Sequence, residues 1–462
     1  MWPLSRLSHG SQAVRASLAV GYQGPHPEAQ RLFRLLGLLE APDFATWPAA
    51  ALLGMPYAEA EDLMEELADI RLLEVAGRDP TGQTRYRLHD LTRAYARECG
   101  EQRDSEDERA AALRRVLSAW LTLTRQAHVR LCGGDYRLPR PTSPSWAAAV
   151  DVAGRHVLPD PLGWADAERA GIVAAVRQCA ALGAHEIGWE LAAAGLHLFE
   201  TRGHHDEWRI THEIALPAAR AAGDVRGQAH MLNGLGRMYF SQGRLEHAIS
   251  YTRRAMRLAH DIGDVRAREF TRIVLGEIEL ARGDLPAAEM CFTQAMDGLG
   301  TLGFPMGIAY ARLGLATARL ARHDLTDADH LLGQALAAYR DAFDTVGQAR
   351  VLLASAEVRR RQRRFGEAIA MLTDAAATYQ AIASPYRYGV ALRALAEVHR
   401  EAGDLSSAIE TWERCLKTLT ALNAPEANEV AALLRRHAPG RHTGDRTVTA
   451  AGSGSAEAFR AS

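Results

Sequence analysis

A forty-residue unit recurs five times between Gly227 and Ala427, and this strict period constrains the fold more than any other feature of the chain. Each unit holds a three-residue turn whose third residue is leucine or phenylalanine, and an alanine three residues later. The turns begin at Gly243, Gly283, His323, Arg363 and Gly403, and the alanines are Ala248, Ala288, Ala328, Ala368 and Ala408. A fixed period of this length predicts a solenoid of stacked helix pairs.

Small residues recur seven positions before each turn and seven after each alanine, where two helices must cross closely. They are Gly236, Gly276, Ala316, Ala356 and Ala396, then Ala255, Ala295, Ala335, Ala375 and Cys415. Glycine at 243, 283 and 403 suits the left-handed conformation that ends a helix. Residues 228–425 are therefore predicted to form five helix pairs in one right-handed superhelix.

This pattern of small residues, turn and alanines resembles the tetratricopeptide repeat, although the usual repeat has about 34 residues. A degenerate unit is predicted over residues 164–227, because Gly203 and Ala215 keep the forty-residue spacing. Trp208 fills the alanine position of that unit, and a bulky residue there suits a terminal repeat. A capping helix is predicted over 426–437, and the small, polar tail 438–462 is expected to be disordered.

Charge and cysteine usage exclude several classes of protein. The chain has 462 residues and a net charge of −2, which makes no general case for nucleic-acid binding. Lys417 is the only lysine, so no Gly-Lys-Ser/Thr and hence no phosphate-binding P-loop exists in the sequence. The five cysteines show no paired spacing, which favours a reducing cytoplasm. No apolar run is long enough to predict a membrane span.

Residues 25–100 have the pattern of a winged helix, after a weakly patterned lead-in at 1–24. Three helices are expected, over Pro27–Glu40, over a short stretch capped by Thr46, and over Tyr57–Ile70. Two short strands, 71–75 and 84–88, follow around an Asp-Pro-Thr-Gly turn. A long helix over 105–131 and a Pro/Gly-rich linker and domain boundary over 132–163 complete the N-terminal part.

The third helix of a DNA-binding winged helix enters the major groove. Here that helix is acidic and carries no basic residue. Its carboxylates are Glu59, Glu61, Asp62, Glu65, Glu66 and Asp69. They would repel phosphates, so direct DNA binding is not expected.

Two stretches, Gln30–Phe44 and Arg85–Ala96 (RYRLHDLTRAYA), resemble the winged-helix part of AfsR-like regulators, which belong to the STAND class of signal-transduction ATPases with NB-ARC modules. The resemblance continues through Trp164–Arg169 (WADAER), Arg202–His204 and Glu207-Trp208 into the repeats. It implies a sensor half that lacks the nucleotide-binding domain, which would be supplied in cis upstream or in trans.

In that family the histidine of a Leu/Met-His-Asp triplet faces the phosphates of bound ADP, which by position is His89. ADP or ATP would then be bound only with a nucleotide domain supplied. The alternative is structural: Asp90 is a good N-cap for a helix over Leu91–Glu98, and His89 helps to cap it.

The remaining polar clusters offer candidate metal, catalytic and docking sites. Adjacent His204 and His205 suit a polar turn better than a metal site, and no metal is predicted. No motif places a nucleophile, so no catalytic residue is assigned and no enzyme is predicted. The arginine-rich run Arg359–Arg364 suits the end of a helix, or alternatively a docking patch for an acidic protein or nucleic acid.

The function expected from the sequence is therefore that of a sensor and interaction region. A peptide, protein or small signal would bind the concave face of the superhelix, and the winged helix would relay that event. The partner-binding candidates lie on the first helices of the units: Tyr239, Arg272, Glu279, Arg312, Arg319 and Arg359. The alternative is a free-standing repeat adaptor with no nucleotide dependence.

Overall fold

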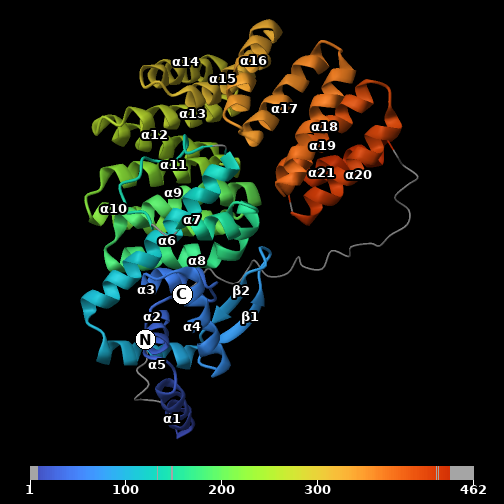
Figure 1. Cartoon of the computed structure of the whole chain (residues 1–462). Helices are drawn as coiled ribbons and strands as arrows, with labels where there is room; N and C mark the ends of the chain where they lie inside the picture. The colour runs from blue at the N-terminus through green and yellow to red at the C-terminus, as the bar shows by residue number, and fades with distance from the viewer. Residues whose placement is uncertain (1–8, 133, 147–148, 423, 425, 438–462) are drawn as a thin grey trace, which may run out of the picture.

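The structure is a computed structural model that describes residues 9–132, 134–146, 149–422, 424 and 426–437. It is mainly helical, with a winged-helix-like N-terminal domain below a curved stack of helix pairs (Figure 1). The tail 438–462 and the first part of the lead-in lie outside the described residues. Within the described residues, no helix combines the length and the hydropathy that crossing a membrane requires.

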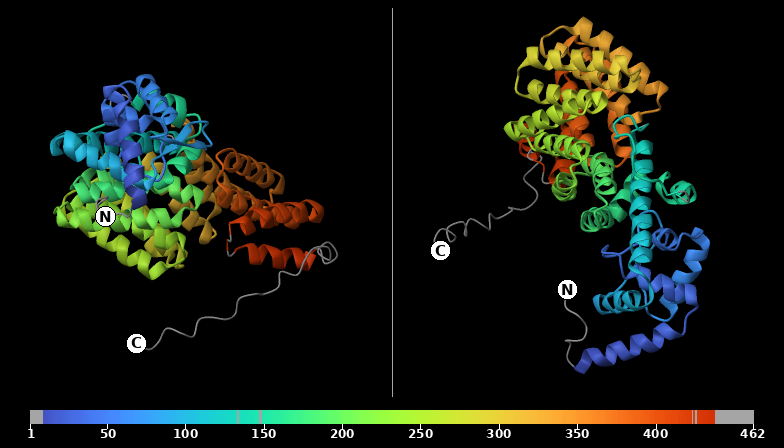
Figure 2. Two further views of the ribbon diagram at one scale, coloured as in Figure 1. Left: turned by 90° about the horizontal axis from the view of Figure 1, so that it is seen from below. Right: turned by 90° about the vertical axis from the view of Figure 1, so that its left-hand side faces the viewer.

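The solenoid consists of helices of constant length joined by three-residue turns. They are α11 Val225–Ser241, α12 Leu245–Asp261, α13 Val265–Ala281, α14 Leu285–Thr301, α15 Pro305–Ala321, α16 Leu325–Asp341, α17 Thr345–Arg361, α18 Phe365–Ala381, α19 Pro385–Glu401 and α20 Leu405–Ala421. The final helix, α21 Glu426–His437, packs on α20 and buries Val430 and Leu434. The five predicted pairs are present, and each is an antiparallel helical hairpin (Figures 1 and 2).

Each turn holds one residue in the left-handed region, at a spacing of twenty. Glycine occupies this position at 243, 263, 283, 303 and 403, as φ values of 62–88° require. His323, Phe343, Arg363 and Ala383 adopt it without being glycine. The next helix is often capped by aspartate: the Asp264 and Asp344 side chains accept hydrogen bonds from the backbone N–H of Ala267 and Gly347.

The small residues lie where helices cross, as the sequence predicts. The alanines at 248, 288, 328, 368 and 408 have no exposed surface. A Cβ atom added to Gly236 would lie 2.4 Å from the Thr252 hydroxyl oxygen, and one added to Gly276 would lie 2.8 Å from Phe292. Larger side chains at these positions would force the paired helices apart.

The base of the solenoid is built on α6 Glu106–Cys132, α8 Pro161–Leu182, α9 His185–Arg202 and α10 His205–Ala221. Helix α6 has 27 residues and is therefore about 40 Å long. It runs from the winged-helix domain, along α8 and α9, to the interior of the superhelix (Figure 2). Trp120, Trp164, Trp189 and Trp208 are fully buried in this base.

The N-terminal domain contains α1 His9–Gln23, α2 Pro27–Leu36, α3 Trp47–Leu53, α4 Tyr57–Asp69, the antiparallel pair β1 Glu74–Arg78 and β2 Thr84–Arg87, and α5 Asp90–Arg103. The lead-in forms a helix because Tyr22 packs on Phe33 and Tyr95. Arg71, expected to begin the first strand, lies in a turn with φ 61°, so that strand starts later. Thr46 occupies the N-cap position of α3 but makes no side-chain capping bond.

The prediction that Asp90 is the N-cap of a helix starting at Leu91 is wrong. Asp90 is the first residue of α5, where its charge suits the helix dipole. His89 occupies the N-cap position, and its side chain makes no capping hydrogen bond. The helix also continues beyond Glu98 to Arg103.

Candidate functional site

The interior of the superhelix is occupied by part of the chain itself. Residues 134–146, here called the groove segment, leave the end of α6 and cross the inner faces of α11 and α13. This stretch was predicted to be part of a linker and a domain boundary. That prediction is wrong, because Tyr136, Leu138 and Pro139 are buried in the solenoid and α7 Ala149–Val152 and a π-helical turn, Ala153–Val157, follow.

Tyr136 anchors the groove segment. Its side chain is 3% exposed and packs in a core cluster with Ile273, Tyr310 and Tyr339 from two successive units. Its hydroxyl donates to the Asp344 carboxylate at the start of α17. A single side chain therefore connects the segment to α13, α15, α16 and α17.

Main-chain groups of the segment are held by charged side chains. The Arg266 guanidinium donates to the carbonyls of Asp135 and Tyr136 at 3.1 and 2.9 Å. The Arg226 guanidinium, forty residues earlier and in the same position of its unit, donates to the Arg140 carbonyl at 2.8 Å.

Further along, the buried Glu190 carboxylate accepts hydrogen bonds from the Thr142 and Ser143 N–H groups and from the Thr142 hydroxyl. The main chain of the segment is thus held through its carbonyls by arginines and through its N–H groups by Glu190.

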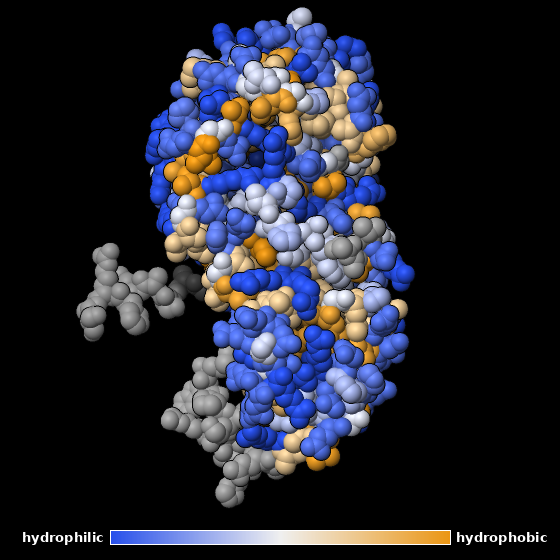
Figure 3. Space-filling view, turned by 60° about the vertical axis from the view of Figure 1, so that its left-hand side comes forward, coloured by the Kyte–Doolittle hydropathy of each residue, from blue (hydrophilic) through white to orange (hydrophobic). Residues whose placement is uncertain are grey.

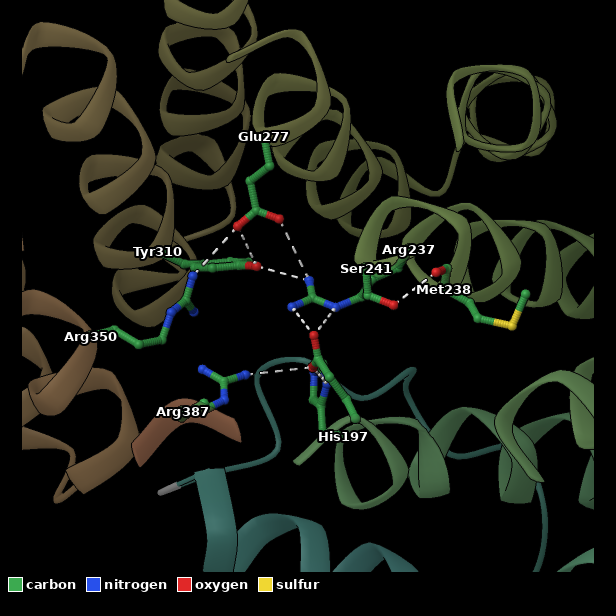
Figure 4. A network of polar contacts seen from close by, with 9 residues as sticks. His197, Arg237, Met238, Ser241, Glu277, Tyr310, Arg350 and Arg387 are labelled. Carbon is green, nitrogen blue, oxygen red and sulfur yellow. Dashed lines mark hydrogen bonds and ion pairs between the residues drawn. The ribbon is translucent and has the colours of Figure 1, made fainter. Parts of the chain in front are cut away.

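A polar network lies beside the segment (Figure 4). The Arg237 guanidinium donates to the Glu200 carboxylate through Nε and Nη2 at 3.1 and 2.9 Å, and to the Tyr310 hydroxyl at 2.9 Å. Tyr310 in turn donates to Glu277, which also faces Arg350 at 3.5 Å. These side chains are 11–18% exposed, apart from the buried Tyr310, so the network lies deep in the superhelix.

Burial governs the protonation of this region. It lowers the pKa of His197 to about 3, although His197 faces Glu200 at 3.2 Å. Burial alone would raise the pKa of Glu200, but Arg237 outweighs it and holds the carboxyl well below its usual range. The network therefore holds a charged carboxylate beside a neutral histidine at pH 7.

The superhelix closes on itself at this network. Arg387 of α19 faces Glu200 of α9 at 3.9 Å. Arg202 donates to the Ala383 carbonyl at 2.8 Å, and the buried Ser384 hydroxyl donates to the Thr201 carbonyl at 3.3 Å. We call these three interactions the closure contact. They join residues separated by more than 180 positions in the chain.

A cavity of about 570 Å³ lies between the groove segment and the start of α11 and α13. Its lining includes Arg140, Arg226, His230, Asn233 and Phe270. The His230 Nε2 and Asn233 Oδ1 atoms are buried and make no hydrogen bond in the described part of the chain. Burial lowers the pKa of His230 to about 4, so its ring is neutral at pH 7.

The residues predicted to bind a partner are placed mostly against side chains of their own or a neighbouring helix. Arg319 pairs with Asp327 at 3.1 Å, and Arg359 pairs with Asp329 at 3.0 Å. Arg272 pairs with the buried Glu269. Tyr239 packs against Tyr251 of α12 with tilted rings, 5.2 Å between ring centroids.

Glu279 is 5% exposed and pairs with Arg253 and Arg282. Arg312 is half-buried, and its Nε makes no hydrogen bond among the described residues. That these six bind a partner stays a prediction. The residues that contact the groove segment lie at other positions of the same helices, such as Arg226 and Arg266.

His89 lies at the surface beside the hairpin of the winged helix. Its side chain is 68% exposed, and Nε2 faces the Glu74 carboxylate. The phosphate-facing role of His89 stays a prediction. On α4, Glu59, Glu61, Asp62, Glu65 and Asp69 are exposed, while Glu66 accepts a hydrogen bond from the His26 N–H.

The sequence motifs of the N-terminal half contact one another. Asp166 of WADAER accepts from Arg202 and faces His204, both at 2.8 Å. Glu168 of the same motif is fully buried between Arg85 of the winged helix and Trp120 of α6. On the described residues no group of three or more His, Cys, Asp or Glu side chains could hold a metal ion.

The arginine-rich run is largely balanced by carboxylates. Arg360 pairs with Glu357 and Glu401, and Arg361 with Glu357. Arg359 and Arg364 both face Glu367.

On the face shown in Figure 3, hydrophobic residues occur in small groups separated by polar ones.

A curved stack of helical hairpins that repeats every forty residues defines a helical-repeat protein of the tetratricopeptide type. Residues 186–438, more than half of the chain, match the model of the MalT-like TPR region, and the chain belongs to that family.

Two regulatory proteins share sequence with the chain. It is 34% identical over 260 residues to the regulatory protein AfsR of Streptomyces coelicolor, which covers 55% of this chain and 25% of AfsR. It is 32% identical over 269 residues to AfsR of Streptomyces griseus, covering 56% and 26%. The chain thus spans about a quarter of the length of the curated relatives it matches.

A solved structure is also similar. It is a signal-transduction ATPase with numerous domains (STAND) that has a tetratricopeptide repeat sensor, from Pyrococcus horikoshii. The identity is 14%, the TM-score is 0.46, and the match covers 90% of this chain and 60% of that chain.

Proposed function

We propose that this chain is the sensor and interaction region of an AfsR-like STAND regulator, and that its superhelix binds a signal on the inner surface. The chain itself is not an enzyme and carries no nucleotide site of its own. The identity to AfsR supports the regulator class, and the tetratricopeptide region supports a binding role.

The observation that carries the proposal is the path of α6. Its first half contacts α3 of the winged helix, and its last residue leads into the groove segment. The ion pair between Arg85 and Glu168 fixes the winged helix to the same base. A structural change in the groove can therefore be transmitted through α6 to the winged helix, which would face a nucleotide-binding domain.

The test supplies a nucleotide-binding domain of an AfsR-like regulator in trans. We expect the chain to bind that domain and to slow its release of ADP. His89→Ala should weaken this effect, whereas His260→Ala, at an exposed histidine of α12, should not.

The alternative, a free-standing adaptor, predicts that neither the parent chain nor the His89→Ala variant changes the rate at which the added domain releases ADP. Measurable ATP hydrolysis by the purified chain without the added domain would contradict the proposal directly.

A further inference from the structure

We propose that the groove segment is an internal occupant of the binding groove, and that the signal is a proline-containing peptide that takes its place. This inference rests on the proposed function, because it assigns the ligand class of the same inner surface. In this proposal the present structure is the closed conformation, in which the groove segment fills the groove.

The contacts that hold the segment are of a kind that another peptide can make. Arg266 and Arg226 donate to main-chain carbonyls, and Glu190 accepts main-chain N–H groups. Every peptide offers these groups. The segment combines a turn at Tyr136, closed by the bond from the Leu138 N–H to the Asp135 carbonyl, with a second half in which Pro139, Pro141 and Pro144 favour extended backbone.

One side chain supplies most of the sequence specificity. The Tyr136 ring fills a buried apolar site between units, and its hydroxyl reaches the Asp344 carboxylate. A competing peptide therefore needs an aromatic residue with a donor at its tip. An aromatic anchor in a buried pocket, surrounded by backbone contacts, is the usual arrangement of a peptide-binding groove.

The internal occupant leaves part of the groove unused. The cavity of about 570 Å³ beside it contains the unpartnered His230 Nε2 and Asn233 Oδ1 atoms. The buried Tyr339 hydroxyl and Arg350 Nη1 also make no hydrogen bond among the described residues. A ligand that satisfies these groups gains interactions that the groove segment lacks, and this difference allows displacement.

The position of the segment explains how displacement would be transmitted. The buried Cys132 is the last residue of α6, so the segment begins directly at the end of the long helix that reaches the winged helix. Release of the segment removes the contacts that tie this helix end to α13 and α17. Cys132 would then become reachable from solvent.

The experiment uses the full chain and a labelled synthetic peptide with the sequence of residues 134–146, GDYRLPRPTSPSW. The Tyr136→Ala variant weakens the binding of the groove segment to the groove. The triple variant, which adds Arg226→Ala and Arg266→Ala, also removes the two guanidinium groups that bind main-chain carbonyls. Binding is followed by fluorescence anisotropy, and release of the segment by site-resolved alkylation of Cys132. Tyr136→Phe, which keeps the ring and loses the hydroxyl, guards against loss of folding.

We expect the peptide to bind the Tyr136→Ala chain at least tenfold more tightly than wild type, and to lose this binding in the triple variant. Tyr136→Phe should lie between wild type and Tyr136→Ala. A peptide with alanine in place of its tyrosine should not bind.

Three results would overturn the proposal. Cys132 could stay protected in Tyr136→Ala, which would make the segment a fixed part of the core. The peptide could fail to bind although Cys132 is exposed, or it could bind all variants equally. None of these results depends on a nucleotide domain, so they are separate from failure of the proposed function.

Discussion

The Arg85 guanidinium and the Glu168 carboxylate form a buried ion pair that joins the winged helix to the base of the solenoid. Arg85 also pairs with Asp43, and Trp120 donates to the other oxygen of Glu168 at 2.9 Å. Two sequence motifs that lie more than eighty residues apart thus meet at one site.

Glu168→Gln should destabilise the chain by about 3 kcal/mol, because it leaves the buried Arg85 charge with Asp43 as its nearest remaining carboxylate. Urea denaturation followed by tryptophan fluorescence measures the change. Glu213→Gln, which removes the exposed partner of Arg209, should cost under about 0.5 kcal/mol. Equal midpoints for the two variants would contradict the assignment of Glu168 as a structural anchor.

Acid should destabilise the folded chain through its buried histidines. Burial lowers the pKa of His212 and of His230 to about 4 and that of His197 to about 3, below an unfolded value of about 6.5. The unfolded state therefore takes up protons first as the pH falls. Each histidine removes about 1.4 kcal/mol of stability per pH unit between 6.5 and its folded pKa.

Thermal melts at pH 7.5, 6 and 5 measure this loss, which should be absent above pH 7. The fully buried His128, stacked on His197, has its pKa lowered in the same way. His128→Leu should therefore make the melting temperature less dependent on pH. An unchanged pH dependence in that variant would show that His128 does not contribute to the loss.

Ala288→Trp should destabilise the chain by about 3 kcal/mol or more, because Ala288 has no exposed surface where α13 and α14 cross. Met290→Trp is the matched control on the same helix, since Met290 is 55% exposed. Thermal melting should separate the two variants by about 3 °C or more. Melting of Ala288→Trp within a degree of the parent would refute the close helix crossing.

Phe343→Gly should stabilise the chain by about 1 kcal/mol. Phe343 has φ 54° and is 84% exposed, so glycine relieves backbone strain and loses little burial. Gly303→Ala, at the equivalent turn forty residues earlier with φ 62°, should destabilise by a similar amount. Denaturant midpoints of the two variants should shift in opposite directions.

The fold was largely predictable because its period is carried by residues whose size or backbone freedom matters. Gly236 and Ala288 stand where helices touch, and Gly243 and Gly283 stand where the chain must turn left-handed. The turn at Phe343 could not be predicted from residue type, because phenylalanine rarely adopts φ above zero.

The candidate site was less predictable, because it depends on contacts between distant parts of the chain. Proline and glycine in 132–163 indicated a linker, but residues 149–157 of this stretch are helical, and local pattern does not show that Tyr136 reaches Asp344. Arg226 and Arg266 could have been found, since they share one position in successive units. Arg319 and Arg359 also share one position in successive units, but they pair with carboxylates of the helices rather than with the groove segment.

The closure contact also limits how this protein can change in evolution. An open solenoid gains or loses repeats at little cost, because each unit touches only its neighbours. Here Thr201 and Ser384 meet only if the number of units between them and the curvature of each unit are both right. Duplication or deletion of one forty-residue unit would carry α19 away from α9, so the repeat number of this chain is fixed by its geometry.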